Sequence, residues 1–275
     1  MKKVLEFTKA VATGNDFIII DNFRSIQMPE KDYPSLAKAL CARRRSVGAD
    51  GLLIAEKSST ADLRMRILNP DGSEVTMCGN GSRCIALYAA REGLAKTGSM
   101  TIATGAGVIK ALVKGDTVKV ALTEPKEIRW NFCLTVRDCP YEVSFVNTGV
   151  PHVVHFVKDI DKVDVKAVGE SIRYHKEFSP SGTNADFVEI LDSHNIRVRT
   201  YERGVEDETY ACGTGVVASA IIAAESEKLE SPVNVETKGG DRLRVYFDLV
   251  DGHFKNVYLE GEAKLIFTGS IKIEG

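Results

Sequence analysis

The stretch MCGNGSRCIALYAA at residues 77–90, and its echo ACGTGVVASAIIAA at residues 211–224, decide the fold of this chain. Each stretch places a cysteine and a Gly-x-Gly pattern before a run of apolar residues, and the two lie about half a chain apart. We expect one helix over residues 79–94 and another over residues 213–229. Because both runs are apolar on most sides, each helix should be buried among the strands of its own domain.

The repeat extends well beyond these two stretches. Matching pairs follow in the same order at a near-constant offset: Thr13-Gly14 with Thr148-Gly149, Ala49-Asp50 with Ala185-Asp186, Leu63–Arg66 with Ile196–Arg199, Glu74 with Glu208, and Thr104 with Thr237. A long repeat in two copies predicts two similar domains, whereas a solenoid needs short periods and several copies. We predict domains at residues 1–127 and 128–275, a last strand that could pack on the first domain, and a linker over Pro125–Val136.

Apolar segments with strand-like patterns outnumber helical ones. Strands are expected at Phe17–Ile20, Leu52–Ala55, Leu63–Ile67, Thr101, Val108–Val113 and Val118–Leu122, and again at His152–Val157, Phe187–Ile190, Ile196–Thr200, Val233, Leu243 and Val257. One further helix is expected in each half, over residues 33–45 and 165–175. Strand and helix do not alternate strictly, which favours the α+β class over a doubly wound sheet.

Bulk properties narrow the class of protein. A net charge of −2 gives no indication of a nucleic-acid or membrane-surface partner. The N-terminus carries Lys2 and Lys3 but no apolar core of signal-peptide length before Thr13, and no apolar run is long enough to span a bilayer. We therefore expect a cytoplasmic enzyme that acts on a small molecule.

The cysteines do not form a structural framework. Six cysteines in 275 residues are too few for a disulfide scaffold, and no CxxC or histidine cluster has the spacing of a zinc site, so no metal is expected. Four of them are expected to be small buried side chains: Cys41, Cys84, Cys133 and Cys139. Cys78 and Cys212 differ because each precedes glycine at a predicted helix start.

A cysteine at a helix N-terminus has a clear chemical use. Free backbone N–H groups and the helix dipole lower the pKa of such a thiol and can also bind a carboxylate. Glycines around Cys78 and Cys212 let a ligand approach the backbone. Two such helix starts acting on one substrate could remove a proton from a carbon beside a carboxylate and return one to its other face. Racemisation or epimerisation without a cofactor is the predicted reaction.

Two other uses of the thiols remain open at this point. The pair could form a disulfide during a redox reaction. Alternatively, one cysteine could be a hydrolase nucleophile with His152, His155 or His175 as its base. A hydrolase needs only one nucleophilic cysteine and therefore does not explain why the motif occurs twice. The duplication favours the two-thiol reaction.

Over nearly its full length the chain resembles the diaminopimelate epimerase family. The resembling segments are Thr13–Phe17, Gly48–Asp50, Asn69–Glu74, Met77–Gly81, Pro151-His152, Tyr201–Gly204 and Ala211–Gly215. The resemblance implies cofactor-independent interconversion of LL- and meso-2,6-diaminopimelate in lysine and peptidoglycan precursor synthesis. It also implies a homodimer and two pseudo-symmetric α+β domains, each a mostly antiparallel barrel-like sheet around a central helix. An epimerase or racemase of another amino acid, such as proline or hydroxyproline, is the alternative.

The resemblance also assigns roles to residues. Cys78 and Cys212 become the acid/base thiols, and His152 and Glu202 the groups that modulate them. The substrate ligands become Asn15, Asn69, Gly79, Asn80, Asn184, Glu202, Arg203, Gly213 and Thr214. A distal ammonium and carboxylate need acidic and cationic partners, which Glu202 and Arg203 supply.

Some residues depart from the family pattern or have a simpler interpretation. Val150 stands where many relatives have Asn, with Asn147 nearby to take over a hydrogen bond, and Gly51 stands where some have Gln. Asn69 lies in a turn sequence, and Arg203 has acidic neighbours that could form a surface ion pair with it. Glu74 and Glu208 recur symmetrically and are expected to be structural.

Overall fold

The chain forms two compact units. The computed structural model describes residues 2–24, 28–95 and 98–274. One unit comprises Met1–Val120 with Gly261–Gly275, and the other comprises Ala121–Glu260. The first unit is therefore built from both ends of the sequence.

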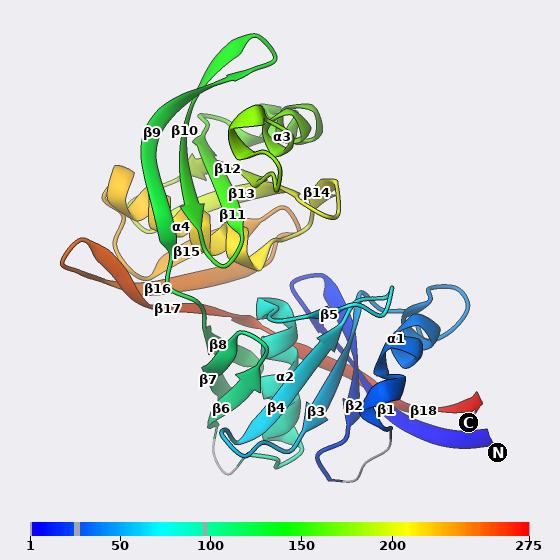
Figure 1. The fold of residues 1–275 in the computed structure, drawn as a ribbon. Coiled ribbons are helices and arrows are strands. Elements are labelled where there is room, and N and C mark those ends of the chain that lie inside the picture. The colour runs from blue at the N-terminus through cyan, green and yellow to red at the C-terminus, as the bar shows by residue number, and fades with distance from the viewer. Residues whose placement is uncertain (1, 25–27, 96–97, 275) are drawn as a thin grey trace. The chain divides into compact units, whose positions relative to one another are not determined.

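The first unit contains two helices and nine strands among the described residues (Figure 1). The strands are β1 (Lys2–Ala12), β2 (Asn15–Asp21), β3 (Gly51–Glu56), β4 (Leu63–Leu68), β5 (Glu74–Val75), β6 (Ser99–Thr104), β7 (Gly107–Lys114), β8 (Thr117–Ala121) and β18 (Lys264–Glu274). The helices are α1 (Tyr33–Cys41) and α2 (Gly79–Arg91), and Glu30–Asp32 forms a short 3-10 turn.

The second unit repeats this inventory. Its strands are β9 (Lys126–Val136), β10 (Cys139–Asn147), β11 (Pro151–Phe156), β12 (Asn184–Ile190), β13 (Asn195–Glu202), β14 (Asp207–Thr209), β15 (Val233–Thr237), β16 (Arg242–Val250) and β17 (His253–Glu262). Its helices are α3 (Val165–Arg173) and α4 (Gly213–Ser226), with 3-10 turns at Ile160–Lys162 and Lys176–Phe178.

The two units share one strand order. In the first, hydrogen-bonded neighbours run β18-β1-β2-β3-β4-β6-β7-β8, and only β2–β3 and β4–β6 are parallel. In the second, they run β9-β10-β11-β12-β13-β15-β16-β17, and only β11–β12 and β13–β15 are parallel. Each parallel pair is joined through a helix, as parallel strands require. The predicted duplication and the α+β class are confirmed.

The predicted linker over Pro125–Val136 is wrong. Most of it is β9, a long strand that pairs with β10 as β18 pairs with β1. The predicted boundary between residues 127 and 128 falls inside this strand. The strand was missed because it alternates weakly, with mostly exposed residues before Leu134 and Val136. β1 and β10 were also missed as strands, and the last strand was predicted without a residue range; it is β18, which belongs to the first unit.

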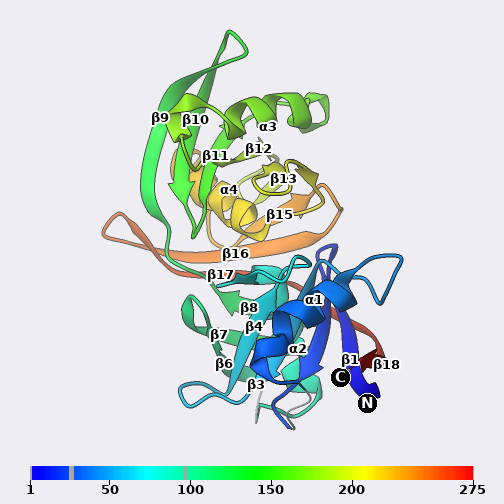
Figure 2. The ribbon, with the colours of Figure 1, turned by 45° about the vertical axis from the view of Figure 1, so that its right-hand side comes forward.

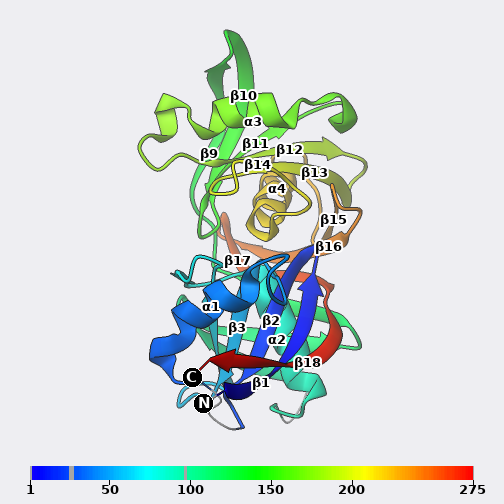
Figure 3. The same cartoon turned by 90° about the vertical axis from the view of Figure 1, so that its right-hand side faces the viewer.

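The central helix of each unit is buried. Ten consecutive residues of α2, from Asn80 to Ala89, are buried, and α2 packs against β1, β2, β3, β4, β7 and β18. Ten consecutive residues of α4, from Gly215 to Ala224, are buried among β10, β11, β12, β13, β15 and β16. Figure 3 shows α4 seen along its axis with strands of its unit around it. The prediction that strands wrap each helix is confirmed.

The strands between two helical layers are apolar on both faces. In the first unit, α1 lies over the strands β2 and β3 (Figure 2). Ile18 and Ile20 of β2 share a core with Leu36 and Leu40 of α1. Phe17, on the alternate face of the same strand, lies near the start of α2. A continuous apolar run results because side chains alternate across a strand and both faces are covered.

Each unit contains an ion pair at the same place in the repeat. Arg66 of β4 binds Glu74 of β5 through two hydrogen bonds, and Arg199 of β13 binds Glu208 of β14 in the same way. The structural role expected for Glu74 and Glu208 is confirmed.

Exposure of the cysteines follows the prediction only in part. Cys41 and Cys84 are buried, but Cys133 and Cys139 lie exposed on β9 and β10, so the prediction was wrong for those two. Among the described helices, none has both the length and the apolar character needed to cross a membrane.

Candidate active site

Cys78 is the residue at which α2 begins. Its backbone is extended, and its sulfur accepts a hydrogen bond from the Gly81 N–H at 3.4 Å. The first bond of the helix follows, from the Ser82 N–H to the Cys78 carbonyl at 2.8 Å. The half-buried thiol therefore caps a helix N-terminus, where free N–H groups favour negative charge.

An apolar wall lies behind this helix start. A Cβ built on Gly81 would lie 3.2 Å from Leu53 and 3.7 Å from Phe17. A Cβ on Gly51 would meet two carbons of the Phe17 ring at 3.2 Å. Gly51 therefore leaves room for Phe17, and a larger residue there would require this ring to move.

Arg83 lies beneath the same helix start, and sequence reasoning missed it. Its side chain is fully buried, and its guanidinium donates to the Asn80 carboxamide oxygen at 2.7 Å and to the Thr13 hydroxyl. Asn80 and Arg83 are three residues apart, which places them on one face of α2. The available signal was a charged residue inside an otherwise apolar helix.

The two predicted asparagine ligands of this unit differ in their surroundings. The Asn15 side-chain oxygen is buried and has no hydrogen-bond partner among the described residues. Asn69 is engaged in its own turn, where its carbonyl accepts from Gly72 and its amide donates to the Ser73 hydroxyl. Asn15 therefore keeps an acceptor for a ligand, whereas Asn69 also holds the turn that its sequence predicted.

Cys212 begins α4 in the second unit. Its side chain is buried, and its sulfur lies 3.4 Å from the Thr214 hydroxyl. The helix starts with the bond from the Val216 N–H to the Cys212 carbonyl at 2.9 Å. This thiol is a partner in a side-chain network rather than a cap of its own helix.

A chain of hydrogen bonds leads from this thiol into the core. His152 Nε2 lies 3.0 Å from the Thr214 hydroxyl, and Nδ1 lies 2.7 Å from an Asp186 carboxylate oxygen. The other Asp186 oxygen accepts from the Thr200 hydroxyl at 2.6 Å. A carboxylate on Nδ1 orients the imidazole and directs Nε2 towards the threonine, as in histidine-based acid/base sites.

Gly215 makes this network possible. A Cβ on Gly215 would lie 2.4 Å from an Asp186 oxygen, so only glycine lets the helix start approach the buried carboxylate. Asp186 and Thr200 were not predicted as site residues. The pairing of Ala49-Asp50 with Ala185-Asp186 in the repeat was the signal that pointed to this aspartate.

The electrostatics of this site overturn one expectation. Burial raises the pKa of Cys212 well above its usual value, and the nearby charges of Glu202 and Asp186 raise it further. Burial also raises the pKa of Glu202. The lowered pKa expected at every helix start is therefore wrong for Cys212.

Asn184 and Arg203 are linked to each other. The Arg203 backbone N–H donates to the Asn184 side-chain oxygen at 2.7 Å, and the Asn184 amide donates to the Pro151 carbonyl at 3.0 Å. Asn184 is thus a buried brace between the strand of His152 and the loop of Arg203. The Arg203 guanidinium donates to the Ser181 carbonyl at 3.1 Å, and among the described residues it forms no ion pair.

A hollow of about 670 Å³ in the second unit contains the Arg203 side chain. Asn147, Pro151 and Ser181 also line it. Asn147 uses its side-chain oxygen to accept the Gly149 N–H at 3.0 Å, which leaves its amide group as the part able to donate to a ligand. Arg203 and the Asn147 amide can both donate to a carboxylate, and Glu127 and Glu177 line the same hollow, where Glu177 pairs with Arg129.

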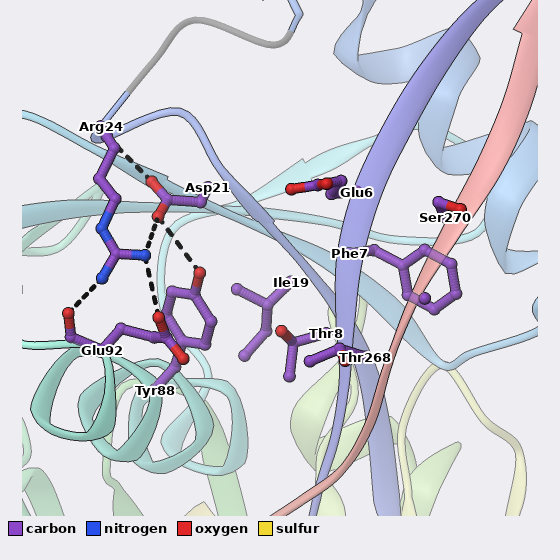
Figure 4. A pocket seen from close by; sticks show the side chains of 11 residues that line it. Glu6, Phe7, Thr8, Ile19, Asp21, Arg24, Tyr88, Glu92, Thr268 and Ser270 are labelled. Carbon is purple, nitrogen blue, oxygen red and sulfur yellow. Dashed lines mark hydrogen bonds and ion pairs between the residues drawn. The ribbon is translucent and has the colours of Figure 1, made fainter.

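A separate hollow of about 530 Å³ lies in the first unit (Figure 4). Arg24 bridges Asp21 and Glu92 at its wall, and Tyr88 donates to Asp21 at 3.2 Å. Tyr88 and Glu92 belong to the C-terminal end of α2, whereas Cys78 is at the other end, about 20 Å away along a helix of this length. None of the predicted site residues lines this hollow.

Solved structures with the same fold define a class. A PhzF-family phenazine biosynthesis protein from Bacillus anthracis matches with a TM-score of 0.75 at 19% identity, covering 98% of this chain and 100% of that one. A probable proline racemase from Agrobacterium radiobacter matches with a TM-score of 0.70 at 13% identity, covering 98% and 93%. The chain has the two-unit α+β fold of these proteins, here with a cysteine at the start of each central helix.

Sequence comparison identifies the family. The family model for diaminopimelate epimerase matches residues 7–128 and 144–266. The diaminopimelate epimerase of Methanocella arvoryzae is 42% identical, with 98% of each chain covered, and that of Chlorobaculum tepidum is 39% identical over 94% of this chain and 98% of its own. The chain belongs to the diaminopimelate epimerase family, and it is an isomerase of the epimerase type.

Proposed function

We propose that this protein interconverts LL- and meso-2,6-diaminopimelate without a cofactor, using Cys78 and Cys212 as its two acid/base groups. The observation that carries the proposal is a thiol at the N-terminus of a buried helix in each of two matching units. Relatives at 42% and 39% identity bear the name of this activity. The reaction would supply precursors of lysine and peptidoglycan.

The helix starts supply the binding half of the proposed chemistry. N–H groups of the first helical turn favour an anion, and glycines at positions 79, 81, 213 and 215 let it approach. In the proposed complex they bind the carboxylate beside the reacting carbon. Negative charge that develops on this carboxylate as the proton leaves is then stabilised by groups already in place.

The thiols supply the proton transfers. Cys212, which burial and anionic neighbours keep neutral, is the proposed proton donor in one direction. When it must act as a base in the other direction, Thr214 and His152 provide a path for its proton, with Asp186 holding the imidazole. Cys78 acts on the opposite face of the same carbon in each direction. One thiol thus gains a proton as the other loses one, and proton exchange with solvent then restores the starting protonation states.

Substrate selection rests on the polar groups outside the thiols. We assign the distal carboxylate to Arg203 and the distal ammonium to Glu202, with Asn15, Asn69 and Asn147 as further hydrogen-bonding groups. The guanidinium in the second-unit hollow and the buried Asn15 oxygen support this assignment. A proline-like substrate has no second amino acid end and would leave these groups unused.

The protein is further proposed to act as a cytoplasmic homodimer. Ile266 and Phe267 on β18 are 53% and 50% exposed, and Val4 on the adjacent β1 is 55% exposed. Exposed apolar side chains on neighbouring strands favour contact with a second copy. Light scattering coupled to gel filtration should give twice the monomer mass of 30.0 kDa.

Proton exchange with solvent tests the proposed reaction most directly. Purified protein is incubated with LL-diaminopimelate in heavy water under reductant, and product stereochemistry and deuterium content are measured. We expect meso product with deuterium at the inverted carbon. Absence of both, alongside turnover of proline or hydroxyproline in the same assay, would replace the proposed substrate with the alternative one.

The redox hypothesis is tested in the same experiment. Loss of activity on oxidation and its recovery on reduction are expected of an epimerase that needs free thiols. Reduction of an external disulfide by the protein, without epimerisation, would support the redox hypothesis instead.

A further inference from the structure

Arg83 is a fully buried cation in a central helix, and the proposed reaction does not use it. Burial of a guanidinium is costly unless its N–H groups are hydrogen-bonded. Two of its acceptors, the Thr13 hydroxyl and the Asn80 carboxamide, are neutral oxygens. Both contacts tie the guanidinium to the helix start of Cys78 and to the turn that precedes β2.

Thr13, which accepts from Arg83, lies in a turn whose backbone conformation is unfavourable for threonine. Thr13 and Gly14 form the two-residue loop between β1 and β2, with φ of 52° and 73°. Such loops prefer Asn or Gly, and positive φ is strained for a β-branched residue. Threonine at this strained position supplies a hydroxyl that accepts a hydrogen bond from Arg83, which glycine could not do. Asn15 directly follows the loop, so Arg83 braces both the helix start and the position of a proposed ligand.

The second unit has no cation at this position. Val217 occupies the place of Arg83 relative to the cysteine, and it is fully buried. There the Thr148 hydroxyl, the counterpart of Thr13, donates directly to the Thr214 carbonyl at 3.2 Å. The brace between turn and helix start is therefore present in both units, but only the first builds it with a charge.

We propose that Arg83 is a positioning residue for Cys78: it fixes Asn80 and the Thr13–Asn15 turn, and its buried charge favours the thiolate of Cys78 over that of Cys212. The proposal deepens the proposed function, on which its catalytic consequence rests. The charge of Asp16 on β2 acts against that of Arg83 at Cys84, although Asp16 also pairs with Lys9 and Arg43.

The charge of Arg83 affects the pKa of a neighbouring thiol, that of Cys84. Burial raises the pKa of Cys84, and the positive charge of Arg83 opposes that rise. Cys84 also responds to the charge of Cys78, which places all three groups within electrostatic range of one another. Cys78, at the other end of the sequence Cys78–Cys84, is only half-buried, so less desolvation opposes the ionisation of its thiol than opposes that of Cys84.

Thiol alkylation measures this effect without relying on turnover. Iodoacetamide labelling at Cys78 and Cys212 is quantified by peptide mass spectrometry from pH 6 to 9.5 in Arg83→Met, Arg83→Lys and wild type. We expect Arg83→Met to slow labelling of Cys78 at pH 7 about tenfold, which corresponds to a shift of about one pH unit in its profile. Labelling of Cys212 should change less than twofold, and Arg83→Lys should retain most of the wild-type rate.

Two further variants separate charge from folding. Arg91→Met makes the same substitution at an exposed position on α2 and should leave both labelling profiles unchanged. Thr13→Gly removes the acceptor while relieving the strained turn, so it remains informative if Arg83→Met does not fold. It should lower kcat/KM for diaminopimelate severalfold without lowering the thermal midpoint.

Specific outcomes would overturn the proposal. A folded Arg83→Met protein with an unchanged Cys78 profile, or an Arg83→Lys protein as slow as Arg83→Met, would show that the charge does not act on this thiol. If Arg83→Met does not fold, wild-type kcat/KM in Thr13→Gly would overturn the positioning role. Failure of the proposed substrate assignment would instead leave the labelling difference intact, so the two failures are distinguishable.

Discussion

The two central helices begin with one pattern, Cys-Gly-x-Gly, in opposite electrostatic surroundings. Cys78 caps its own helix against an apolar wall, with the buried cation Arg83 beneath it. Cys212 is buried beside a histidine–carboxylate pair formed by His152 and Asp186. The duplication repeats the backbone that presents a thiol but not the charges around it. An acid and a base of the same residue type can thus be held in different protonation states.

Removal of either thiol is the most severe test of the proposal that Cys78 and Cys212 have separate acid and base roles. Cys78→Ala and Cys212→Ala should each lower kcat for diaminopimelate by about a thousandfold or more, because each direction needs one base and one acid. Coupled assays in both directions, with circular dichroism to verify folding, measure this effect. Near wild-type turnover in either variant would contradict the two-thiol assignment.

Asp186→Asn should have the next largest effect, about a hundredfold on kcat. The amide cannot act as a carboxylate partner for His152 Nδ1, so the imidazole loses the tautomer and orientation that direct Nε2 to Thr214. Steady-state kinetics across pH 6–9 measures both kcat and KM.

The repeat provides a matched control for this variant. Asp50 occupies the corresponding place in the first unit, but it is exposed and pairs with Arg43. Asp50→Asn should change kcat less than threefold. Equal losses in both variants would show that the histidine–carboxylate pair is not what distinguishes the second unit.

The fold was largely predictable from sequence because the repeat is carried by buried positions. The apolar runs behind Cys78 and Cys212, together with the alternating strands, are imposed by burial and therefore visible in one sequence. β9 and β18 were harder to predict because both are mostly exposed, and β18 also pairs with β1 at the other end of the sequence.

The site residues were predictable from sequence only where the residue type alone indicates a chemical role. Thiols at helix starts can be recognised alone, but Asp186 and Arg83 acquire meaning through their partners. Asp186 meets His152 because their strands are parallel neighbours, and Arg83 meets Thr13 across the unit. Such contacts depend on strand order, which the local sequence does not state.

Substitution of the helix-start glycines should reveal the same asymmetry in stability. Gly215→Ala would place a Cβ 2.4 Å from an Asp186 oxygen, whereas Gly81→Ala would place one 3.2 Å from the terminal methyl group of Leu53. We expect Gly215→Ala to reduce the free energy of unfolding by about 2 kcal/mol, and Gly81→Ala by less than about 1 kcal/mol. Urea denaturation at pH 7 compares the two. A larger loss in Gly81→Ala would mean that the first helix start is the more tightly packed one.

The smallest expected effect is a loss of folding stability at alkaline pH, which arises from the ionisation of Cys212. Its pKa is raised in the folded protein, chiefly by burial, so an unfolded chain gives up this proton at lower pH than the folded one. Stability is therefore full below the ordinary thiol pKa of about 8.5 and is lost as pH rises above it, by up to about 1.4 kcal/mol per pH unit for one proton. Cys41 and Cys84, whose pKa values burial also raises, contribute the same slope in every variant.

Cys212→Ala should flatten this alkaline loss, whereas Cys133→Ala, at an exposed position on β9, should leave it unchanged. Urea unfolding at half-unit steps from pH 7 to 10 gives the slope for each protein. An unaltered slope in Cys212→Ala would mean that the pKa of this thiol is the same in the folded and unfolded states, and thus not raised by burial. The second helix start would then be able to hold a thiolate despite its anionic neighbours, and the division of roles between the two thiols would have to come from the bound substrate rather than from the protein.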